Sequence, residues 1–359
     1  MNHETTQPLK ALGLTPWFET QHQNHPCEPG QLARVIAVDR EQYLLLNESE
    51  AFRAKLSGKF RHESQSPTEL PCVGDWLCVE KHDDDDFGLI HSLLPRQTFL
   101  RRKSVGESSD YQMIAANIDI VFIVQSCHYD FNLKRLERYL VMVADGGATP
   151  VILLTKTDLI PPEQLELLIQ QIREAGINAT VQPLSHITRN GVDELHQLLL
   201  PEKTYCFVGS SGVGKSTIIN GLLHEQRLAT QSVSSTGEGT HTTVRRELIV
   251  LDNGAMVIDT PGMREFGVLA SDDALEGGFA DIQLLAQACR FRDCTHTNEP
   301  GCAVLKALRD GKITPEHLEN FNKLSTELHF NQMSHAEKRK KDKAFGKFIK
   351  NAKKHIDRH

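Results

Sequence analysis

The chain has 359 residues, a length typical of two or three domains, and its 39% hydrophobic and 24% charged residues indicate folded cores. Its longest apolar runs are too short to cross a bilayer, and its N-terminus has no charged region followed by an apolar one, so we expect a cytoplasmic protein with no membrane contact. The net charge of −7 conceals an asymmetry, because residues 334–359 hold ten Lys/Arg against three Asp/Glu, a local charge of +7. An acidic body with a basic tail suggests a polyanionic partner.

The first third of the chain predicts a short lead-in followed by a β-domain. Residues 1–30 are polar, contain Pro26 and Pro29, and are expected to form a flexible segment. Residues 31–108 carry short apolar stretches separated by polar turns, a pattern typical of a small barrel such as the OB-fold, which often binds oligonucleotides. A β-domain without a ligand fits the pattern equally well. The acidic run Asp83–Asp86 is interpreted as a solvated hairpin turn rather than a cation site.

Residues 109–270 alternate strand and helix patterns and predict a doubly wound α/β domain with a mainly parallel sheet. The expected strands are Ile118–Val124, Val151–Leu154, Ala179–Pro183, Tyr205–Val208, Leu248–Leu251 and Met256–Ile258. The expected helices are Asn132–Ala144, Pro162–Ala175, Val192–Leu199 and one after Lys215.

The segment Gly209–Ser216 matches the phosphate-binding pattern G-x-x-x-x-G-K-[ST] in full, after a strand and before a helix. Its backbone N–H groups can surround phosphate oxygens, and the helix N-terminus adds a favourable dipole. We expect Lys215 to reach the β- and γ-phosphates and Ser216 to bind Mg²⁺. The nucleotide contacts expected here are Gly209, Ser210, Ser211, Gly212, Val213, Gly214, Lys215, Ser216 and Thr217.

Asp259-Thr260-Pro261-Gly262 follows an apolar strand, so Asp259 is expected to hold Mg²⁺ through water and the Gly262 amide to sense the γ-phosphate. Between this motif and the phosphate loop, Thr242 and Thr243 are the candidates for a further Mg²⁺ ligand that orders with the nucleotide.

The base is indicated by Thr155-Lys156-Thr157-Asp158, which resembles the guanine-reading N/T-K-x-D signature. The Asp158 carboxylate can accept from N1–H and the 2-amino group of guanine, whereas adenine offers no such pair of donors. The Lys156 stem can lie along the base. Ser185 follows the next expected strand and is a weaker candidate for a second base-contacting loop.

The order of these motifs is unusual, because an ordinary GTPase begins with the phosphate loop and ends with the base-reading loops. Here the base-reading motifs precede Gly209, so the GTPase domain is circularly permuted, with the helix Val192–Leu199 leading to the phosphate-loop strand. Met263 stands one residue after Gly262, where many GTPases place a water-orienting glutamine. His241, assisted by Lys215 and Thr243, is the catalytic candidate; an exposed loop histidine is the alternative.

Cys289, Cys294, His296 and Cys302 form C-x4-C-x-H-x5-C, a complete tetrahedral donor set for one structural Zn²⁺. With eight cysteines in all, the other five scattered, we expect metal binding rather than disulfides. Residues 271–333 are assigned to this helical domain, and 334–359 to a basic helix in which Phe345 and Phe348 lie among lysines. RNA binding by that helix and simple packing on its own domain are equally compatible with the pattern.

Together the permuted order, the barrel, the cysteine cluster and the basic C-terminal helix resemble the bacterial ribosome small subunit-dependent GTPase A (RsgA) family over about residues 30–350. Stretches such as Leu100-Arg101-Arg102 and His241-Thr242-Thr243 also match. The resemblance implies a monomeric factor in late maturation of the 30S subunit that contacts 16S rRNA through its barrel and zinc domain. It implies that the 30S subunit stimulates hydrolysis of GTP to GDP and phosphate, and that hydrolysis accompanies release. A nucleotide-gated placeholder with incidental hydrolysis is the alternative, and an ATP-dependent nucleic-acid enzyme is disfavoured by Asp158.

Overall fold

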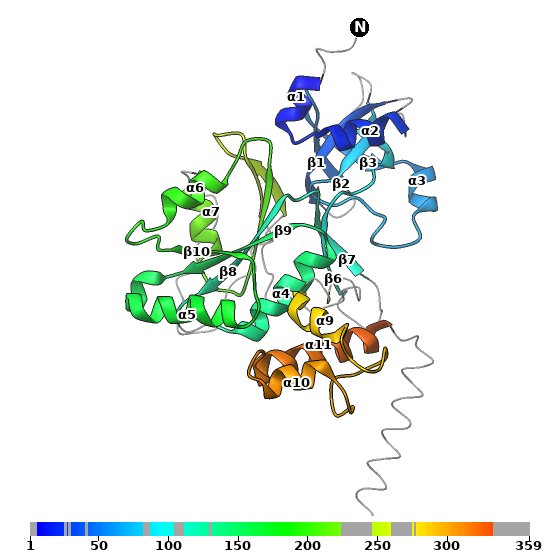
Figure 1. Cartoon of the computed structure of the whole chain (residues 1–359). Helices are drawn as coiled ribbons and strands as arrows, with labels where there is room; N and C mark the ends of the chain where they lie inside the picture. The colour runs from blue at the N-terminus through cyan, green and yellow to red at the C-terminus, as the bar shows by residue number, and fades with distance from the viewer. Residues whose placement is uncertain are drawn as a thin grey trace, which may run out of the picture.

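The computed structural model describes residues 6–24, 27, 30–39, 42–81, 87–103, 111–128, 131–223, 246–259, 275 and 278–332. A β-barrel, an α/β domain and a C-terminal group of helices follow one another along the chain, and the helical group lies beneath helix α4 of the α/β domain (Figure 1).

The N-terminal segment is helical and packed, which differs from the flexible lead-in expected from its polar composition. It forms α1 (Thr6–Ala11) and α2 (Pro16–Asn24). The side chains of Leu12, Leu14 and Phe18 are buried and pack with Leu32 and Trp76 of the barrel. A few apolar residues in a polar stretch are sufficient for this packing because the barrel supplies the other half of the cluster.

The barrel has the predicted OB-like form. Its strands are β1 (Gln31–Asp39), β2 (Gln42–Leu46), β3 (Ala51–Leu56), β4 (Trp76–Glu80) and β5 (Gly88–Leu93). They pair in the order β1-β2-β3-β5-β4, and β4 returns to β1, which closes the barrel. The helix α3 (Gly58–Glu63) follows β3 and is capped by the hydroxyl of Ser57, which accepts from the Phe60 backbone N–H.

Alternation along the strands separates the barrel core from its outer face. Ala33 and Val35 of β1 and Leu77 and Val79 of β4 belong to the inner cluster. The intervening residues of the same strands face the N-terminal segment. The strand side-chain period of two therefore gives β1 and β4 two buried faces.

A two-stranded hairpin, which the sequence analysis did not identify, connects the barrel to the α/β domain. It consists of β6 (Phe99–Lys103) and β7 (Tyr111–Ala116). Arg101 of β6 forms two hydrogen bonds with the Asp145 carboxylate, at 2.6 and 2.9 Å, and its guanidinium lies 4.0 Å from the ring centroid of Tyr111. The hairpin is thereby fixed to the end of α4.

The α/β domain confirms the prediction of a mainly parallel, doubly wound sheet. Its strands are β8 (Ile120–Ser126), β9 (Thr149–Thr155), β10 (Thr180–Leu184), β11 (Thr204–Val208), β12 (Glu247–Val250) and β13 (Met256–Asp259). They lie in the order β10-β9-β8-β11-β13-β12, with β12 antiparallel to β13. β12 also pairs with β1 at Ala37 and Glu247, so the sheet continues into the barrel.

Helices cover both faces of this sheet. They are α4 (Leu133–Asp145), α5 (Pro162–Glu174), α6 (Val192–Leu198) and α7 (Lys215–Leu223). The apolar side chains of α4 and α5 pack into one core, and those of α6 and α7 pack into a second core across the sheet. The C-terminal helices are α9 (Ala280–Ala286), α10 (Ala303–Arg309) and α11 (Pro315–Gln332). Their core includes Val141 of α4, which anchors them to the α/β domain.

The cysteines divide into three groups. Cys27 and Cys78 form a disulfide with a Cα–Cα distance of 5.2 Å, so the expectation that disulfides are absent is wrong for this pair. Their proximity arises because β4 presents Cys78 on the outer barrel face, where the N-terminal segment ends at Cys27; sequence spacing alone does not reveal such an approach. Cys72, Cys127 and Cys206 are buried thiols, and the other three lie in the C-terminal domain. Within the ranges that the structure describes, no helix is both long and apolar enough to cross a membrane.

Candidate nucleotide site and metal centre

The predicted nucleotide-binding motifs meet at one edge of the α/β sheet. Thr155 ends β9, Ser185 follows β10, Gly209 follows β11 and Asp259 ends β13. All four strands run parallel, so their carboxyl ends lie on the same side. Ligands of open α/β sheets bind at this edge. The permuted sequence order therefore leaves the spatial order of an ordinary nucleotide site intact.

The base-reading loop is held by the hydroxyl of Ser185. The hydroxyl of Ser185 donates to Oδ1 of Asp158 over 2.6 Å, and the backbone N–H of Thr188 donates to the Ser185 hydroxyl over 3.1 Å. Ser185 itself is buried, whereas Asp158 lies on the surface in the short 3₁₀ helix η1 (Thr157–Leu159). The Asp158 carboxylate is thus oriented while it keeps room to accept two further hydrogen bonds.

Thr155 connects the base-reading loop to the phosphate loop. Its buried hydroxyl donates to the carbonyl oxygen of Val213 over 2.6 Å, with a longer 3.4 Å contact to the carbonyl of Gln125. The Thr155 side chain therefore joins the base-reading loop to the phosphate loop. A threonine hydroxyl is sufficient to donate that hydrogen bond. Threonine can therefore occupy position 155, where asparagine is commoner in this signature.

The phosphate loop depends on a glycine at its first position. A Cβ at Gly209 would clash with the carbonyl oxygen of Val124 on the neighbouring strand, and its φ of 146° lies in the region that favours glycine. The Nζ of Lys215 donates to the carbonyl oxygens of Gly209 and Ser210, each over 2.6 Å. These carbonyls hold the ammonium at the mouth of the loop, from which it can turn toward phosphate oxygens.

The magnesium and switch residues are only partly covered by the structure. Ser216 lies in the first turn of α7, directly after the phosphate loop. Asp259 ends β13, which pairs with β11, the strand that leads into that loop. His241, Thr242, Thr243, Gly262 and Met263 lie outside the described residues, as do the run Asp83–Asp86 and the basic tail from 334 to 359.

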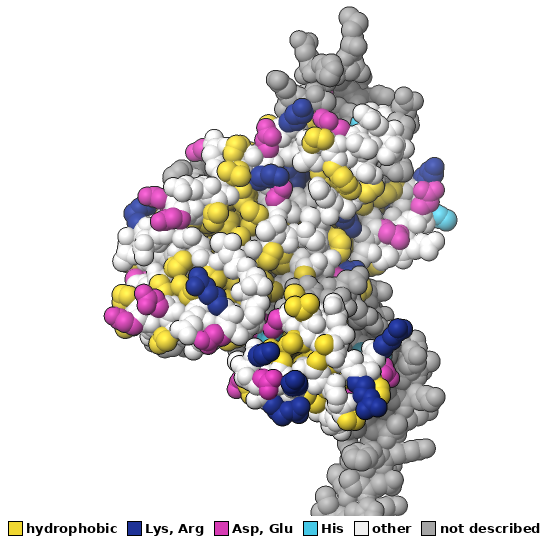
Figure 2. Space-filling view, in the orientation of Figure 1, with side chains coloured by type: hydrophobic (Ala, Val, Ile, Leu, Met, Phe, Trp, Pro, Cys, Tyr) yellow, Lys and Arg dark blue, Asp and Glu magenta, His cyan; other side chains and the backbone are white. Residues whose placement is uncertain are grey.

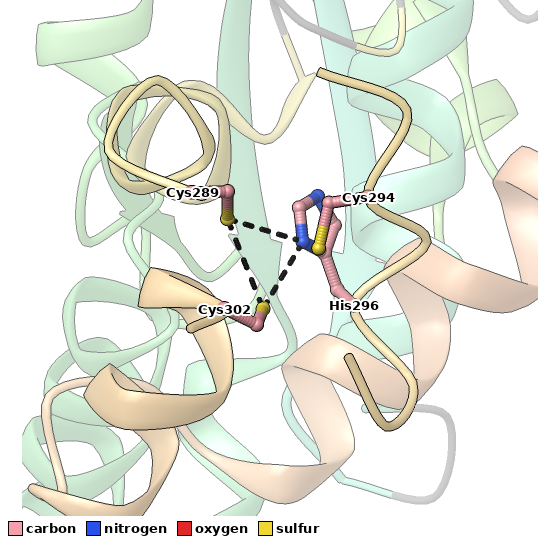
Figure 3. A group of neighbouring side chains, drawn as sticks. All are labelled: Cys289, Cys294, His296 and Cys302. Carbon is pink, nitrogen blue, oxygen red and sulfur yellow. Dashed lines mark hydrogen bonds between the residues drawn. The ribbon is translucent and has the colours of Figure 1, made fainter. Parts of the chain in front are cut away.

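The predicted cysteine and histidine donors form one cluster in the C-terminal domain (Figure 3). Cys289 follows α9, Cys294 and His296 lie in the connecting loop, and Cys302 caps α10. All four donor atoms lie within 4.8 Å of one another. The φ of 58° at His296 turns the loop so that Nδ1 faces the sulfurs.

The spacing of these donors fits a tetrahedral metal ion. The Sγ atoms of Cys289 and Cys302 are 3.8 Å apart, and Nδ1 of His296 lies 3.7 Å from Cys289 Sγ and 3.4 Å from Cys302 Sγ. A tetrahedron with zinc bond lengths places two sulfurs about 3.8 Å apart and a sulfur and a nitrogen about 3.5 Å apart. Burial raises the pKa of Cys289, but backbone N–H groups, including that of Ala303, donate to it and the net pKa is lowered. The cluster can hold one metal ion as a closed, structural centre.

A charged cluster that the sequence analysis did not single out joins the metal domain to α4. Nδ1 of His317 in α11 lies 2.5 Å from Oε1 of Glu137, and Nε2 lies 3.1 Å from Oδ2 of Asp281 in α9. Nδ2 of Asn320 donates to the other oxygen of Glu137. At the edge of the contact, Arg138 forms two hydrogen bonds with Glu327, at 3.0 and 2.9 Å. The only sequence signal was a glutamate on the otherwise apolar face of a helix, where a charged residue must find a partner.

Comparisons with known proteins agree with this arrangement. A family model described as RsgA GTPase matches residues 93–269. The chain is 43% identical over 305 residues to small ribosomal subunit biogenesis GTPase RsgA 2 of Lactiplantibacillus plantarum, covering 84% of this chain and 85% of that protein. It is 36% identical over 348 residues to RsgA 2 of Vibrio parahaemolyticus, covering 97% and 93%.

Two solved structures share the fold. YjeQ from Thermotoga maritima superposes with a TM-score of 0.62 at 24% identity, over 83% of this chain and 98% of that one. YloQ, described as a circularly permuted GTPase, superposes with a TM-score of 0.61 at 25% identity, over 87% and 99%. The permuted motif order thus has a counterpart in a solved structure.

Proposed function

This chain belongs to the RsgA family of GTPases, and from that membership and its site we propose that it acts in late biogenesis of the small ribosomal subunit. It hydrolyses GTP to GDP and phosphate, and we propose that the 30S subunit stimulates this hydrolysis. The relatives named above are described as small ribosomal subunit biogenesis GTPases, which supports the 30S subunit as the partner.

The observation that carries guanine recognition is the bond from Ser185 to Asp158. It fixes a surface carboxylate at the same sheet edge as the phosphate loop, where a base can reach it. An unpaired carboxylate facing adenine would lose its hydrogen bonds, which selects guanine. Lys156 is proposed to lie along the base.

The residues that bind the phosphates and Mg²⁺ are proposed from the chemical groups that they carry. We assign the β- and γ-phosphates to the backbone of Gly209–Ser216 and to Lys215, and Mg²⁺ to Ser216, Asp259 and one of Thr242 and Thr243. When bound, Mg²⁺ neutralises the charge that develops on the phosphate oxygens. His241 is proposed to orient the attacking water, and the Gly262 amide to sense the γ-phosphate.

RNA contact is proposed for the barrel, the C-terminal helices and the basic tail. Basic side chains gather on the surface of the C-terminal domain (Figure 2), among them the exposed Lys306, Arg309 and Lys312. Cations on such a surface would neutralise phosphates of 16S rRNA and release counterions. We assign zinc to the Cys₃His centre because three thiolates and an imidazole are its preferred structural set.

Release of the factor is proposed to follow hydrolysis. Asp259, which ends β13, and Ala280, which begins α9, are separated in the sequence by 20 residues that include Gly262. We propose that a change at Gly262 is transmitted along this short stretch of sequence to the metal domain. We propose a monomer with the domain limits 31–108, 109–270 and 271–333, preceded by the segment 1–30 and followed by 334–359.

The decisive experiment is GTP turnover with and without purified 30S subunits, across a salt series. We expect stimulation that declines steeply with salt, as backbone contacts to RNA require. Turnover that 30S subunits leave at its intrinsic rate would reject the proposal. The variant His241→Ala distinguishes this function from that of a nucleotide-gated placeholder. If the variant cannot hydrolyse GTP but subunits still mature normally, the placeholder function is favoured.

A further inference from the structure

The N-terminal segment covers an apolar outer face of the barrel. Leu32, Trp76 and Cys78 point away from the barrel core and pack against Leu12, Leu14 and Phe18 of the segment. The rings of Phe18 and Trp76 lie 6.1 Å apart between centroids. Removing the segment would expose this face, so the segment acts as its cover.

The same segment reaches the α/β domain through one buried side chain. Nη1 of Arg34 donates to the carbonyl oxygen of Leu12, and Nη2 of Arg34 donates to the hydroxyl of Thr204 over 2.9 Å. Thr204 begins β11, the strand that leads into the phosphate loop. The segment, the barrel and the α/β domain therefore meet at Arg34, which is 1% exposed.

The Cys27–Cys78 disulfide fixes the cover at its far end. Cys78 lies on β4, opposite Leu32 of β1, and Cys27 lies between α2 and β1. The two residues are 51 positions apart in the chain, and they are 8% and 2% exposed. The other contacts that the described part of the segment makes are hydrogen bonds and packing, which open and close freely, whereas this bond responds to redox conditions.

We propose that Cys27 and Cys78 form a redox-dependent latch, made and broken by exchange with a low-molecular-weight disulfide such as oxidised glutathione, that fixes the N-terminal segment on the barrel. One cysteine thiolate attacks the glutathione disulfide and releases one glutathione thiolate. The second cysteine thiolate attacks the resulting mixed disulfide, closes the Cys27–Cys78 bond and releases the second glutathione. Two electrons pass from the cysteine pair to glutathione, and the two thiol protons end on the released glutathione thiols.

Burial sets the behaviour of the latch. An attacking thiolate must reach a sulfur that the segment covers, so exchange proceeds through a state in which the segment has lifted from β4. Once the bond is closed, that state becomes rarer, because the ends of a long loop are joined in every conformation. Once it is reduced, the described part of the cover is held by the cluster around Trp76 and by Arg34.

The tryptophans provide a direct readout. The chain contains two, Trp17 in α2 and Trp76 in β4, and both lie in this contact. The zinc-loaded full-length protein is equilibrated over a series of ratios of reduced to oxidised glutathione. Tryptophan emission, cleavage of the segment by a dilute protease, and alkylation of Cys27 and Cys78 measured by mass spectrometry are followed together.

We expect all three readouts to change at one glutathione ratio, with cleavage at least about tenfold faster in the reduced protein. The double variant Cys27→Ser, Cys78→Ser should behave like the reduced protein at every ratio. Cys72→Ser, which removes a buried thiol of the same domain, should keep the full response, and metal content should stay constant throughout. Two results would overturn the latch: alkylation of both thiols under oxidising conditions, or equal cleavage of the oxidised protein and the double-serine variant. Neither GTP nor ribosomal subunits are needed.

Discussion

His317 of α11 and Glu137 of α4 face each other across the junction between the metal domain and the α/β domain, with 2.5 Å between Nδ1 and Oε1. Both side chains are almost fully buried, at 3% and 2% exposure. Asp281 of α9 lies on the other ring nitrogen. Three helices from two domains thus share one buried imidazolium, and the junction depends on its charge.

The pH dependence of this junction follows from the His317 pKa. Burial lowers the pKa, but the hydrogen bonds and charges of Asp281 and Glu137 outweigh it and raise the pKa from 6.5 to about 9. Because the pKa of His317 is higher in the folded state than in the unfolded state, protonation of His317 stabilises the folded state. This contribution is complete at pH values below the unfolded-state pKa and is lost as the pH rises through the folded-state pKa. We therefore expect the stability of the docked helices to fall between pH 6.5 and about 9, by up to about 3 kcal/mol.

Urea unfolding followed by amide hydrogen exchange in α11 measures this loss. His317→Gln should remove the slope in this pH window and destabilise α11 throughout it, because Glu137 then lacks its charged partner. His329→Gln, an exposed histidine on the same helix, serves as the control and should retain the slope. An unchanged slope in His317→Gln would assign the pH dependence to other groups.

Thr155→Val tests the bond between the base-reading and phosphate loops. Valine keeps the shape of the side chain but leaves the Val213 carbonyl without its 2.6 Å donor in a buried site. An unsatisfied buried acceptor costs about 1–3 kcal/mol, so GTP affinity should fall by about five- to 150-fold. Titration with a fluorescent GTP analogue gives the value. Thr155→Ser retains the hydroxyl and should bind within about twofold of the parent protein; a serine variant as weak as the valine variant would point to packing instead.

Removal of the metal should unfold the C-terminal domain selectively. Chelation removes the whole ion, and Cys289→Ser removes one of its ligands. The loop 289–302 that surrounds the ion has little apolar core of its own. We expect one zinc per chain to be lost and amide protection in α9 and α10 to collapse, while α5 and α7 keep theirs. Elemental analysis and hydrogen exchange measure the two effects. Cys206→Ala, a buried thiol on β11, should retain the metal.

The placement of the described nucleotide motifs at one sheet edge and of the four metal donors in one cluster was predictable, because short stretches of sequence carry them. Gly209–Ser216 and Thr155–Asp158 each hold their chemistry within one loop, and a parallel sheet brings strand ends together whatever their order in the chain. The spacing of Cys289, Cys294, His296 and Cys302 likewise places four donors in one short loop and its flanking helices. Local sequence therefore determined these sites.

The contacts between domains were not predictable in this way. His317 and Glu137 are 180 residues apart, and Cys27 and Cys78 are 51 apart, so neither pairing has a local signature. The strand β3 (Ala51–Leu56) has a weak sequence signal because Arg53 and Lys55 interrupt its apolar positions, although that alternation suits a barrel wall with one solvated face. These pairings and this strand depend on residues from distant parts of the chain, and a single sequence does not show which distant residues come together.

Arg34 provides the last prediction, because it is a buried cation that binds carbonyl and hydroxyl oxygens rather than a carboxylate. Its guanidinium donates to Gly74 O over 3.2 Å, Asn117 O over 3.1 Å and the Thr204 hydroxyl over 2.9 Å. Arg34→Leu would remove the guanidinium donor from these oxygens; Gly74 O would keep its bond from Asn117 Nδ2, whereas the carbonyl oxygens of Leu12 and Asn117 would lose the Arg34 donor. At about 1–3 kcal/mol for each lost bond, the free energy of unfolding should fall by about 3 kcal/mol or more.

The exposed Arg53→Leu is the matched control and should change the unfolding free energy by less than about 0.5 kcal/mol. Because Arg34 contacts the N-terminal segment as well as β11, we also expect Arg34→Leu to increase protease cleavage of the segment. Urea unfolding and limited proteolysis test the two effects together. If Arg34→Leu proved as stable as Arg53→Leu, leucine packing would have to compensate for the lost hydrogen bonds, and Arg34 would not be the point that joins the three parts.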